Sequence, residues 1–342
     1  MFATIHSPTL TSDSNDDYVM VWGASTGELV AKWNYGGDGE SVAWAGSVIA
    51  VGGRRGRLCL WHLNRQANGN YDAVEVLNTE IGESNDRILV CLSHDGMDLM
   101  LGLKDSDKWN KWGLPTAKVG YVGRMATSGS DPDVTSRWKS DGWVGHRVES
   151  MCFSPDSSRL LVGGGGRYVT VLDAVSLVPI QQLRDGAENT GGARVAWSSA
   201  NVLASVSETR DDTTVALWHS VDGSYARLGS VRMRYDYDNT FNCVCFSPDG
   251  SRFLTGGSSL QLWDTSSRNV LWFRTLERER ILAVEWSGGS HFLTINSENV
   301  VTVWSPAVLS SPERQGRRRE PGQRPRPGDT RGRSDAWPLL RL

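Results

Sequence analysis

CFSPDGSRFLTGGSSLQLWD, residues 245–264, contains three short apolar runs separated by two turn-forming segments. The Ser-Pro-Asp-Gly segment favours a tight turn, because Pro presets φ and Gly tolerates positive φ. The runs on either side are rich in aromatic, aliphatic and β-branched residues, which are typical of buried strands. The stretch therefore predicts a strand, a turn, a strand, a second turn and a third strand.

The same order of residue types returns along the chain. A near copy runs from Cys152 to Asp173, and weaker copies are anchored at Trp44, Leu92, Trp197 and Trp286. With Phe153 and Phe246 as the anchors of the two clear copies, successive anchors lie 48, 61, 44, 49 and 40 residues apart. Spacings in this range are typical of repeat architectures.

Each copy continues into a fourth, looser run, such as residues 269–273. Four antiparallel strands in a unit of roughly 40–45 residues match one blade of a β-propeller. A single sheet of this kind cannot cover both of its faces. Sheets stacked around a ring cover one another and leave only short edges.

On these motifs the chain resembles the WD-repeat β-propeller family over roughly residues 1–310. Trp263-Asp264 is its one Trp-Asp pair, and Gly145-His146 is its one Gly-His pair that enters a repeat. The resemblance implies a His–Ser–Asp–Trp hydrogen-bond network in each blade. Most copies here lack the His and the turn Asp, so we expect their stability to come mainly from packing.

The resemblance implies an all-β fold, a seven-bladed β-propeller of four-stranded antiparallel blades. We expect one propeller domain over residues 1–312. Seven residues can end the third strand of a blade: Trp22, Trp61, Trp112, Leu172, Trp218, Trp263 and Trp304.

The first blade is predicted to be incomplete. Residues 2–7 (FATIHS) align with residues 292–297 (FLTINS), which places Met1 at the start of a second strand. Either the native start lies upstream of Met1, or the innermost strand of this blade comes from elsewhere. We favour the upstream start, because the Arg-rich end of the chain is a poor source for a central strand.

The composition points to an intracellular protein. No apolar stretch approaches the ~20 residues of a membrane helix, and no export signal opens the chain. Cys91, Cys152 and Cys245 lie beside blade anchors, which favours buried thiols in a reducing compartment. We expect a cytoplasmic or nuclear location without membrane contact.

Residues 313–342 differ in character from the rest of the chain. They hold nine Arg and four acidic residues, so they carry +5, whereas the whole chain carries −3 and residues 1–312 carry −8. We expect a disordered Arg/Pro/Gly-rich tail. This tail either binds RNA or acidic proteins, acts as a nuclear import signal, or is simply solvated.

The sequence offers no signature of catalysis, and no cofactor or metal is expected. The six His residues are scattered over different copies, without metal-ligand spacing to Cys or acidic residues. No nucleophile elbow or zinc-protease motif occurs. Gly163–Gly166 resembles a phosphate loop, but no Lys-Ser/Thr pair follows it, which favours a tight reversal.

Two groups of residues are candidate partner-binding sites. Trp138 and Trp143 lie in a polar stretch that we predict to be a loop, where they either anchor a partner or fold down against a neighbouring blade. The turns between second and third strands carry Arg residues on the face that this family commonly uses for partners: Arg54, Arg55, Arg57, Arg167 and Arg210. Such a rim either binds acidic or phosphorylated peptides or is a solvated mixed-charge surface.

Three functions remain open at this stage. The leading hypothesis is a non-enzymatic scaffold that presents loop residues to other proteins as part of a complex. The second is an RNA-associated or nucleolar assembly factor whose nucleic-acid contact comes only through the Arg-rich tail. The third is an enzyme or small-molecule sensor at the mouth of the channel.

Overall fold

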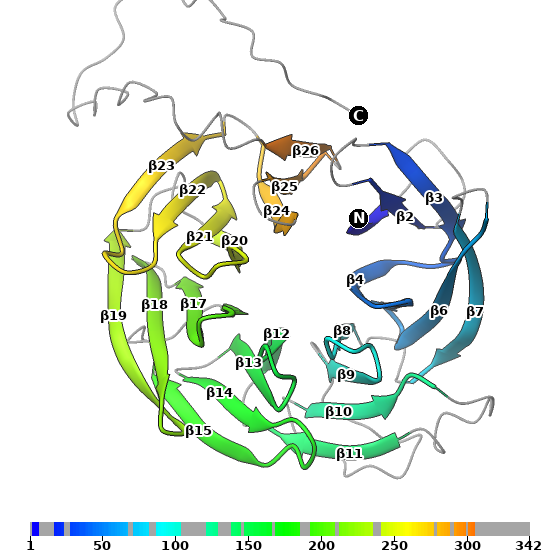
Figure 1. The fold of residues 1–342 in the computed structure, drawn as a ribbon, viewed down its shortest axis with the longest axis horizontal. Helices are drawn as coiled ribbons and strands as arrows, with labels where there is room; N and C mark the ends of the chain where they lie inside the picture. The colour runs from blue at the N-terminus through cyan, green and yellow to red at the C-terminus, as the bar shows by residue number, and fades with distance from the viewer. Residues whose placement is uncertain are drawn as a thin grey trace, which may run out of the picture.

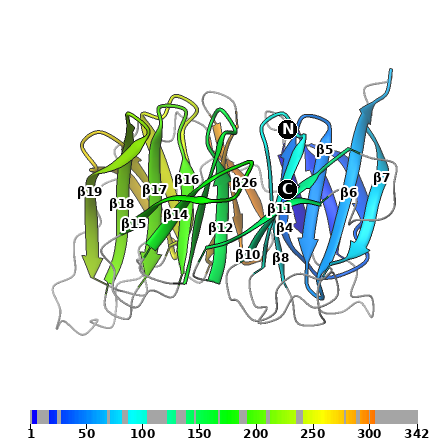
Figure 2. The same cartoon turned by 90° about the horizontal axis from the view of Figure 1, so that it is seen from below.

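The computed structural model is a ring of seven β-sheets around a central channel (Figure 1). Strands run along the ring axis, and turns gather at its two ends (Figure 2). The structure describes residues 2–6, 17–23, 28–67, 71–81, 87–103, 121–128, 138–144, 147–165, 168–184, 192–208, 212–234, 241–276, 279–287, 291–298 and 300–304. Within these ranges no helix is long and apolar enough to cross a membrane.

We number the sheets as blades 1 to 7 along the chain. Blade 1 contains β1 (Phe2–His6), β2 (Tyr18–Trp22) and β3 (Leu29–Asn34). Blade 2 contains β4 (Gly39–Ala45), β5 (Val48–Gly53), β6 (Arg57–Arg65) and β7 (Tyr71–Glu80). Blade 3 contains β8 (Ile88–Leu92), β9 (Asp98–Leu103), β10 (Tyr121–Ala126) and β11 (Trp138–Trp143).

Blades 4 to 7 follow the same order. Blade 4 contains β12 (Arg147–Phe153), β13 (Arg159–Gly165), β14 (Tyr168–Asp173) and β15 (Pro179–Arg184). Blade 5 contains β16 (Ala193–Trp197), β17 (Val202–Glu208), β18 (Asp212–Val221) and β19 (Ser224–Arg234). Blade 6 contains β20 (Phe241–Phe246), β21 (Arg252–Gly257), β22 (Ser259–Asp264) and β23 (Val270–Thr275). Blade 7 contains β24 (Ile281–Ser287), β25 (His291–Asn296) and β26 (Val301–Trp304).

In blades 2 to 7 the first strand lies nearest the channel, and we call it the inner strand. Each inner strand pairs antiparallel with the second strand of its blade, as β20 does with β21. The seven-bladed all-β propeller predicted from the sequence is confirmed.

The Ser-Pro-Asp-Gly turn of blade 6 forms as the sequence predicts. Ser247 Oγ donates to Asp249 Oδ1 at 2.6 Å, and Gly250 adopts the left-handed region with φ of 69°. Asp156 in blade 4 and Asp95 in blade 3 accept the same hydrogen bond from the Ser two residues earlier. The repeated phrase thus closes the turn between the first two strands of three blades.

Blade 1 lacks an inner strand among the described residues, as the sequence predicts. Phe2 of β1 pairs with Trp22 of β2, as Phe253 of β21 pairs with Trp263 of β22. Trp22 Nε1 also donates to Thr4 Oγ1 at 2.8 Å, and the equivalent bond from Trp263 to Thr255 measures 2.9 Å. β1 is therefore a second strand.

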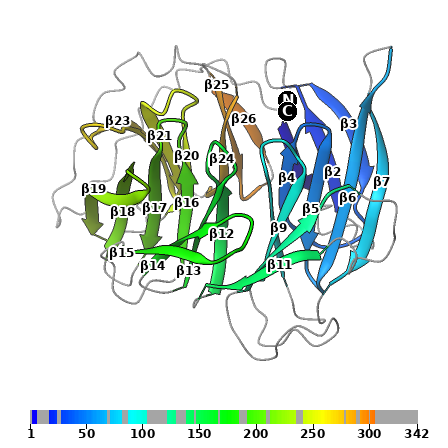
Figure 3. The same ribbon diagram turned by 60° about the horizontal axis from the view of Figure 1, so that its bottom comes forward.

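The ring is held together by six apolar clusters, each of which joins two neighbouring blades. Between blades 6 and 7, for example, Leu254 of β21 packs with Ile281 and Val284 of β24. Burial of this apolar surface is the main stabilising contribution to such a ring. Figure 3 shows blade 1 beside blade 2, to which the first cluster along the chain joins it. No cluster of described residues joins blade 7 to blade 1.

Blade 3 corrects two predictions. Its third strand is β10, so the predicted end of that strand at Trp112 is wrong, and Trp112 itself lies outside the described residues. The sequence between β9 and β10 is unusually long, and its Trp was mistaken for the end of a strand. Trp138 and Trp143 are the first and last residues of the outer strand β11, not loop residues. The outer strand of a blade does not need a continuous apolar run, so the polar sequence of this stretch was mistaken for a loop.

Candidate functional site: the channel mouth and the open seam

A β-bulge recurs at the same position of four inner strands. The pairing registers of β4, β12, β20 and β24 each skip one residue: Glu40, Glu149, Asn242 and Leu282. A bulge leaves one residue out of the ladder and changes the direction of its side chain. These four residues lie at the ends of the inner strands, and we call their surroundings the channel mouth.

Arg194 of β16 in blade 5 links the channel-mouth residues of the two blades on either side of it, blades 4 and 6. Its Nη1 donates to the Glu149 carboxylate at 3.0 Å and to the Glu149 carbonyl oxygen at 3.2 Å. Its Nε donates to the carbonyl oxygen of Asn242 at 3.0 Å, and Asn242 Nδ2 reaches the carbonyl of Ile281 at 3.3 Å. A continuous set of polar bonds thus joins blades 4, 5, 6 and 7.

On the other side of the mouth, Glu40 is enclosed by two arginines. Arg54 Nε donates to Glu40 Oε1 at 2.7 Å, and Arg87 Nη1 lies 3.7 Å from Glu40 Oε2. The backbones of Arg54 and Arg87 also form an isolated antiparallel bridge. The turn of blade 2 and the start of blade 3 therefore meet at the Glu40 carboxylate, and the charges of Asp38 and Asp17 also act on Arg54. We call it the arginine rim, and define it as Arg54, Arg55 and Arg87.

The structure separates the three arginines predicted in blade 2. Arg57 is half-buried, its guanidinium lies 5.1 Å from the centroid of the Tyr35 ring, and its Nη1 donates to the carbonyl of Gly36. It stabilises the fold and is removed from the candidate site. Arg54 is exposed but paired with Glu40. Arg55 is exposed on a left-handed turn residue with φ of 58°.

The other predicted partner-binding residues stay predictions. Arg167 and Arg210 lie outside the described residues. The backbone of β11 places Trp138 opposite Met125 and Trp143 opposite Tyr121 on the outside of blade 3. The structure does not describe the two indole side chains.

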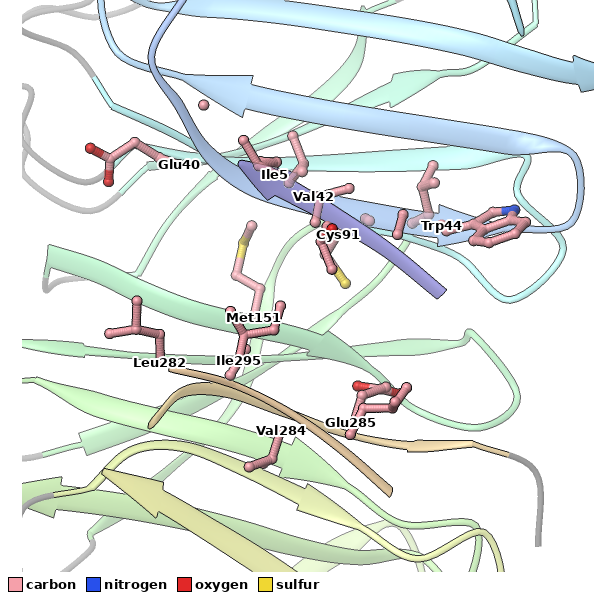
Figure 4. A pocket seen from close by; sticks show the side chains of 18 residues that line it. Ile5, Glu40, Val42, Trp44, Cys91, Met151, Leu282, Val284, Glu285 and Ile295 are labelled. Carbon is pink, nitrogen blue, oxygen red and sulfur yellow. The ribbon is translucent and has the colours of Figure 1, made fainter. Parts of the chain in front are cut away.

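A cavity of about 710 Å³ is lined by blades 1, 2, 3, 4 and 7 and includes the space between blades 7 and 1 (Figure 4). β1 and β4 line one side of it, with Ala3, Ile5 and Val42 among the lining residues. β24 and β25 line the other side, mainly through apolar residues: Leu282, Ala283, Val284, Leu293 and Ile295. We call the part of this cavity between β1 and β24 the open seam.

Two carboxylates line the cavity, those of Glu40 and Glu285. Glu285 of β24 faces the cavity, and the desolvation caused by the surrounding protein raises its pKa to about 7. Burial likewise raises the pKa of the Cys91 and Cys243 thiols to about 12. Thiols with such pKa values carry little of the thiolate form that nucleophilic chemistry needs.

The described residues of the channel mouth and the arginine rim present charges suited to binding. In the ranges that the structure covers, no three His, Cys, Asp or Glu side chains are grouped so that they could hold a metal ion. The channel mouth and the arginine rim instead present paired charges and one exposed arginine. Such an arrangement can recognise anionic groups through charge-assisted hydrogen bonds.

The bulge residues at the mouth were not among the residues predicted from the sequence. A signal for two of them was present, because Glu-Ser precedes the anchor by the same distance in two copies, as ESVAW at residues 40–44 and ESMCF at residues 149–153. Asn242 and Leu282 share the position but not the residue type, so no residue pattern could have identified all four.

Comparisons with known proteins agree with this fold. The model of the "WD domain, G-beta repeat" family matches residues 139–173 and 231–264, the segments that end in blades 4 and 6. The WD repeat-containing protein 26 homolog of Drosophila melanogaster is 28% identical over 114 residues. The match covers 32% of this chain but only 18% of that longer protein.

A solved structure is similar in fold over most of the chain. A chain in the "Crystal Structure of Mitotic Checkpoint Complex" superposes with a TM-score of 0.62 and covers 85% of this chain and 81% of its own length. Its sequence identity of 18% means that this likeness concerns the fold alone. Two segments of the chain are thus similar to WD repeats, and the seven-bladed ring is the fold that such repeats typically build.

Proposed function

We propose that this protein is a non-enzymatic interaction platform that binds an acidic or phosphorylated segment of a partner protein at the arginine rim. Propellers of this family generally act as scaffolds for protein–protein interaction. The observation that carries the finer proposal is the exposed Arg55 beside the Arg54–Glu40–Arg87 group.

The charge of the rim favours an anionic partner. The Glu40 carboxylate faces two guanidinium groups, and Asp38 and Asp17 also act on Arg54, so the exposed Arg55 beside them is the guanidinium offered to a partner. A guanidinium offers a fixed fork of donors that matches carboxylate and phosphate oxygens. The ion pair to Glu40 also fixes the position of Arg54, so less side-chain entropy is lost when a partner binds.

Rigid support is the second argument. Arg57 N donates to the carbonyl of Arg54 at 3.2 Å and closes the turn that carries Arg55. The side chain of Arg57 in turn packs on Tyr35, which is 2% exposed. A binding arginine on a turn that is held from below is pre-organised for its partner.

Affinity capture from cell extract with quantitative mass spectrometry tests this proposal. Arg55→Ala should lose bound proteins that the unchanged chain retains, because it removes the exposed guanidinium without touching the Glu40 ion pairs. Arg65→Ala is the matched control, since Arg65 is an exposed arginine at the far end of β6, the strand that follows the turn of Arg55.

Both variants should keep the melting temperature of the unchanged protein, since surface substitutions of this kind usually change stability by less than ~0.5 kcal/mol. Proteins lost with Arg55→Ala should also be released from the unchanged chain by a phosphoserine-containing acidic peptide. Recovery of the same proteins with all three chains would reject the arginine rim as the binding site.

A further inference from the structure

An aromatic side chain closes the outer end of three of the interfaces between blades. Tyr35 lies between blades 1 and 2, Tyr225 between blades 4 and 5, and Trp272 between blades 6 and 7. All three are buried, with at most 7% of the residue exposed. The interface between blades 5 and 6 differs, because the aromatic residue on its outer strand β23 is Phe273, which is 47% exposed.

Phe273 belongs to an exposed apolar surface between β19 and β23. The pairing of β22 with β23 places Phe273 and Val270 on the same face as Trp263, which packs against blade 5. Val270 is 41% exposed, and Leu228 of β19 is 43% exposed. Arg268 Nη1 donates to the carbonyl oxygen of Leu228 at 3.0 Å and so joins blade 6 to β19 beside these residues.

Arginines surround this apolar surface. β19 (SYARLGSVRMR) and β23 (VLWFRT) contain four Arg and no acidic residue. Arg227 is exposed, and the side chain of Arg232 is 57% exposed although it lies 3.8 Å from the Asp212 carboxylate. The two outer hairpins, residues 212–234 and 259–275, hold five Arg and three Asp and therefore carry +2, whereas the chain up to residue 312 carries −8.

The opposite side of the ring carries a surface of complementary charge on β7 (Figure 1). β7 (YDAVEVLNTE) contains three acidic residues and no basic residue. Asp72 and Glu75 are exposed and flank Val74, an apolar residue that is 47% exposed. The partner strand β6 contains two Arg: the Arg57 side chain is turned toward blade 1, and Arg65 pairs with the first residue of β7.

Both surfaces thus combine exposed apolar side chains with charges of one sign. We call the surface on blades 5 and 6 the basic perimeter, defined as Arg227, Leu228, Arg232, Val270 and Phe273. We call the surface on blade 2 the acidic perimeter, defined as Asp72, Val74 and Glu75.

We propose that the basic perimeter of one copy of this protein binds the acidic perimeter of a second copy, so that rings associate side to side. Carboxylates of one copy meet guanidinium groups of the other, and Val74 covers Phe273. Because the two surfaces differ and lie on opposite sides of the ring, the contact is heterologous and extends into an open row of rings. The arginine rim takes no part, and the inference does not depend on the proposed function of that rim.

The lengths and shapes of the strands favour contact through side chains. β19 has eleven residues and β7 has ten, so each strand is more than ~30 Å long. The register of β19 skips Leu228, and that of β7 skips Val76. Such bulges interrupt the row of backbone groups that an added strand needs. The apolar residues therefore form the centre of the contact and the charged residues its rim, as in other protein interfaces.

A second copy is favoured over a separate acidic protein or an anionic membrane. The acidic perimeter supplies both features that the basic perimeter requires, an exposed apolar side chain and carboxylates on either side of it. Both halves of the contact are therefore present in one chain.

Sedimentation velocity of the full chain over a series of concentrations tests the proposal. The unchanged chain should associate as its concentration rises, and NaCl raised from ~50 to ~500 mM should weaken association at least ~10-fold, because salt screens exposed charges. Phe273→Asp and Val74→Arg should each weaken association ~10-fold or more, since each removes an apolar contact and places like charges opposite one another. An equimolar mixture of these two variants should associate, because each keeps the surface that the other lacks.

Met97 provides matched controls, since it is 53% exposed on a turn of blade 3 outside both surfaces. Met97→Asp and Met97→Arg should associate as the unchanged chain does, and so should Arg55→Ala at the arginine rim. All variants should keep the melting temperature of the unchanged protein. Where Phe273→Asp lowers it, Arg227→Glu tests the same surface without an apolar substitution.

Every other outcome overturns the proposal. An unchanged chain that stays monomeric at all concentrations would reject the contact. Loss of association with Phe273→Asp but not with Val74→Arg would assign it to a symmetric contact between two basic perimeters. Loss with Arg55→Ala would assign it to the arginine rim. Flotation of the monomeric unchanged chain, but not of Phe273→Asp, with phosphatidylserine vesicles would assign the basic perimeter to a membrane surface.

Discussion

The buried Thr–Trp hydrogen bond of blade 6 gives the sharpest test of how the repeated phrase stabilises a blade. Trp263 Nε1 donates to Thr255 Oγ1 at 2.9 Å, and the two residues are 1% and 0% exposed. Thr255→Val conserves the volume of the side chain but leaves the indole N–H buried without an acceptor. An unsatisfied buried donor costs ~1–3 kcal/mol of unfolding free energy.

The expected shift in melting temperature follows from the size of the ring. With ~2.1 cal/mol/K of unfolding entropy per residue, a propeller of roughly 300 residues has ~0.6 kcal/mol/K, so the loss corresponds to ~2–5 °C. Urea unfolding followed by tryptophan fluorescence measures the same loss as a lower midpoint without a change in slope.

Thr214→Val is the matched control, since Thr214 is 2% exposed and its buried hydroxyl has no hydrogen-bond partner among the described residues. Removing that hydroxyl should leave stability unchanged or raise it. Equal destabilisation by Thr255→Val and Thr214→Val would refute the argument, because the loss would then come from the shape change and not from the lost acceptor.

Three further predictions concern pH and packing. Burial raises the pKa of Glu285 to about 7, so the folded state binds the carboxyl proton more tightly than the unfolded state does. The free energy of unfolding should therefore fall as pH rises from ~5 to ~8. Urea titrations at several pH values should show that Glu285→Gln removes this fall. Hydrogen bonds from Ser247 and Ser251 lower the pKa of Asp249. Its contribution to the free energy of unfolding is therefore present above pH ~4 and is lost as pH falls through the lowered pKa. Asp249→Asn should reduce the loss of stability at acidic pH, and an unchanged loss would argue against this role. Gly163→Ala should cost ~1–3 kcal/mol, because the new Cβ would lie 2.6 Å from the carbonyl oxygen of Ala193, and a neutral effect in thermal melts would contradict the close approach of blades 4 and 5.

Much of the fold could be predicted because the turns carry local chemistry. Pro, Asp and Gly at fixed places specify the turn that the structure contains at Asp249, and the aromatic ends of strands such as Trp263 fall where expected. Blade 3 could not be predicted in the same way. The long sequence between its second and third strands changes the spacing of the repeat. Trp112 was therefore predicted to end the third strand, which is β10 in the structure.

The candidate site could be predicted only in part, because its residues are defined by pairing between distant strands. The turn pattern identifies Arg54 and Arg55, but it does not show that Glu40, which pairs with Arg54, leaves the ladder of β4 at a bulge. The same pattern placed Arg57 in one group with Arg54 and Arg55, although the Arg57 side chain packs on Tyr35 and donates to the carbonyl of Gly36. Neither contact can be derived from sequence periodicity, since both depend on how blades 1, 2 and 3 stack.

Hydrogen exchange of the second strands in the free protein tests the central claim most directly, namely that the ring is closed at six interfaces and open at the seam between blades 7 and 1. Amides of β1 should exchange much faster than those of the equivalent strands β5, β9, β13, β17, β21 and β25, because no inner strand covers its edge in the described structure. Equal protection of β1 and its six counterparts in the free protein would show that the seam is already filled and would contradict the account.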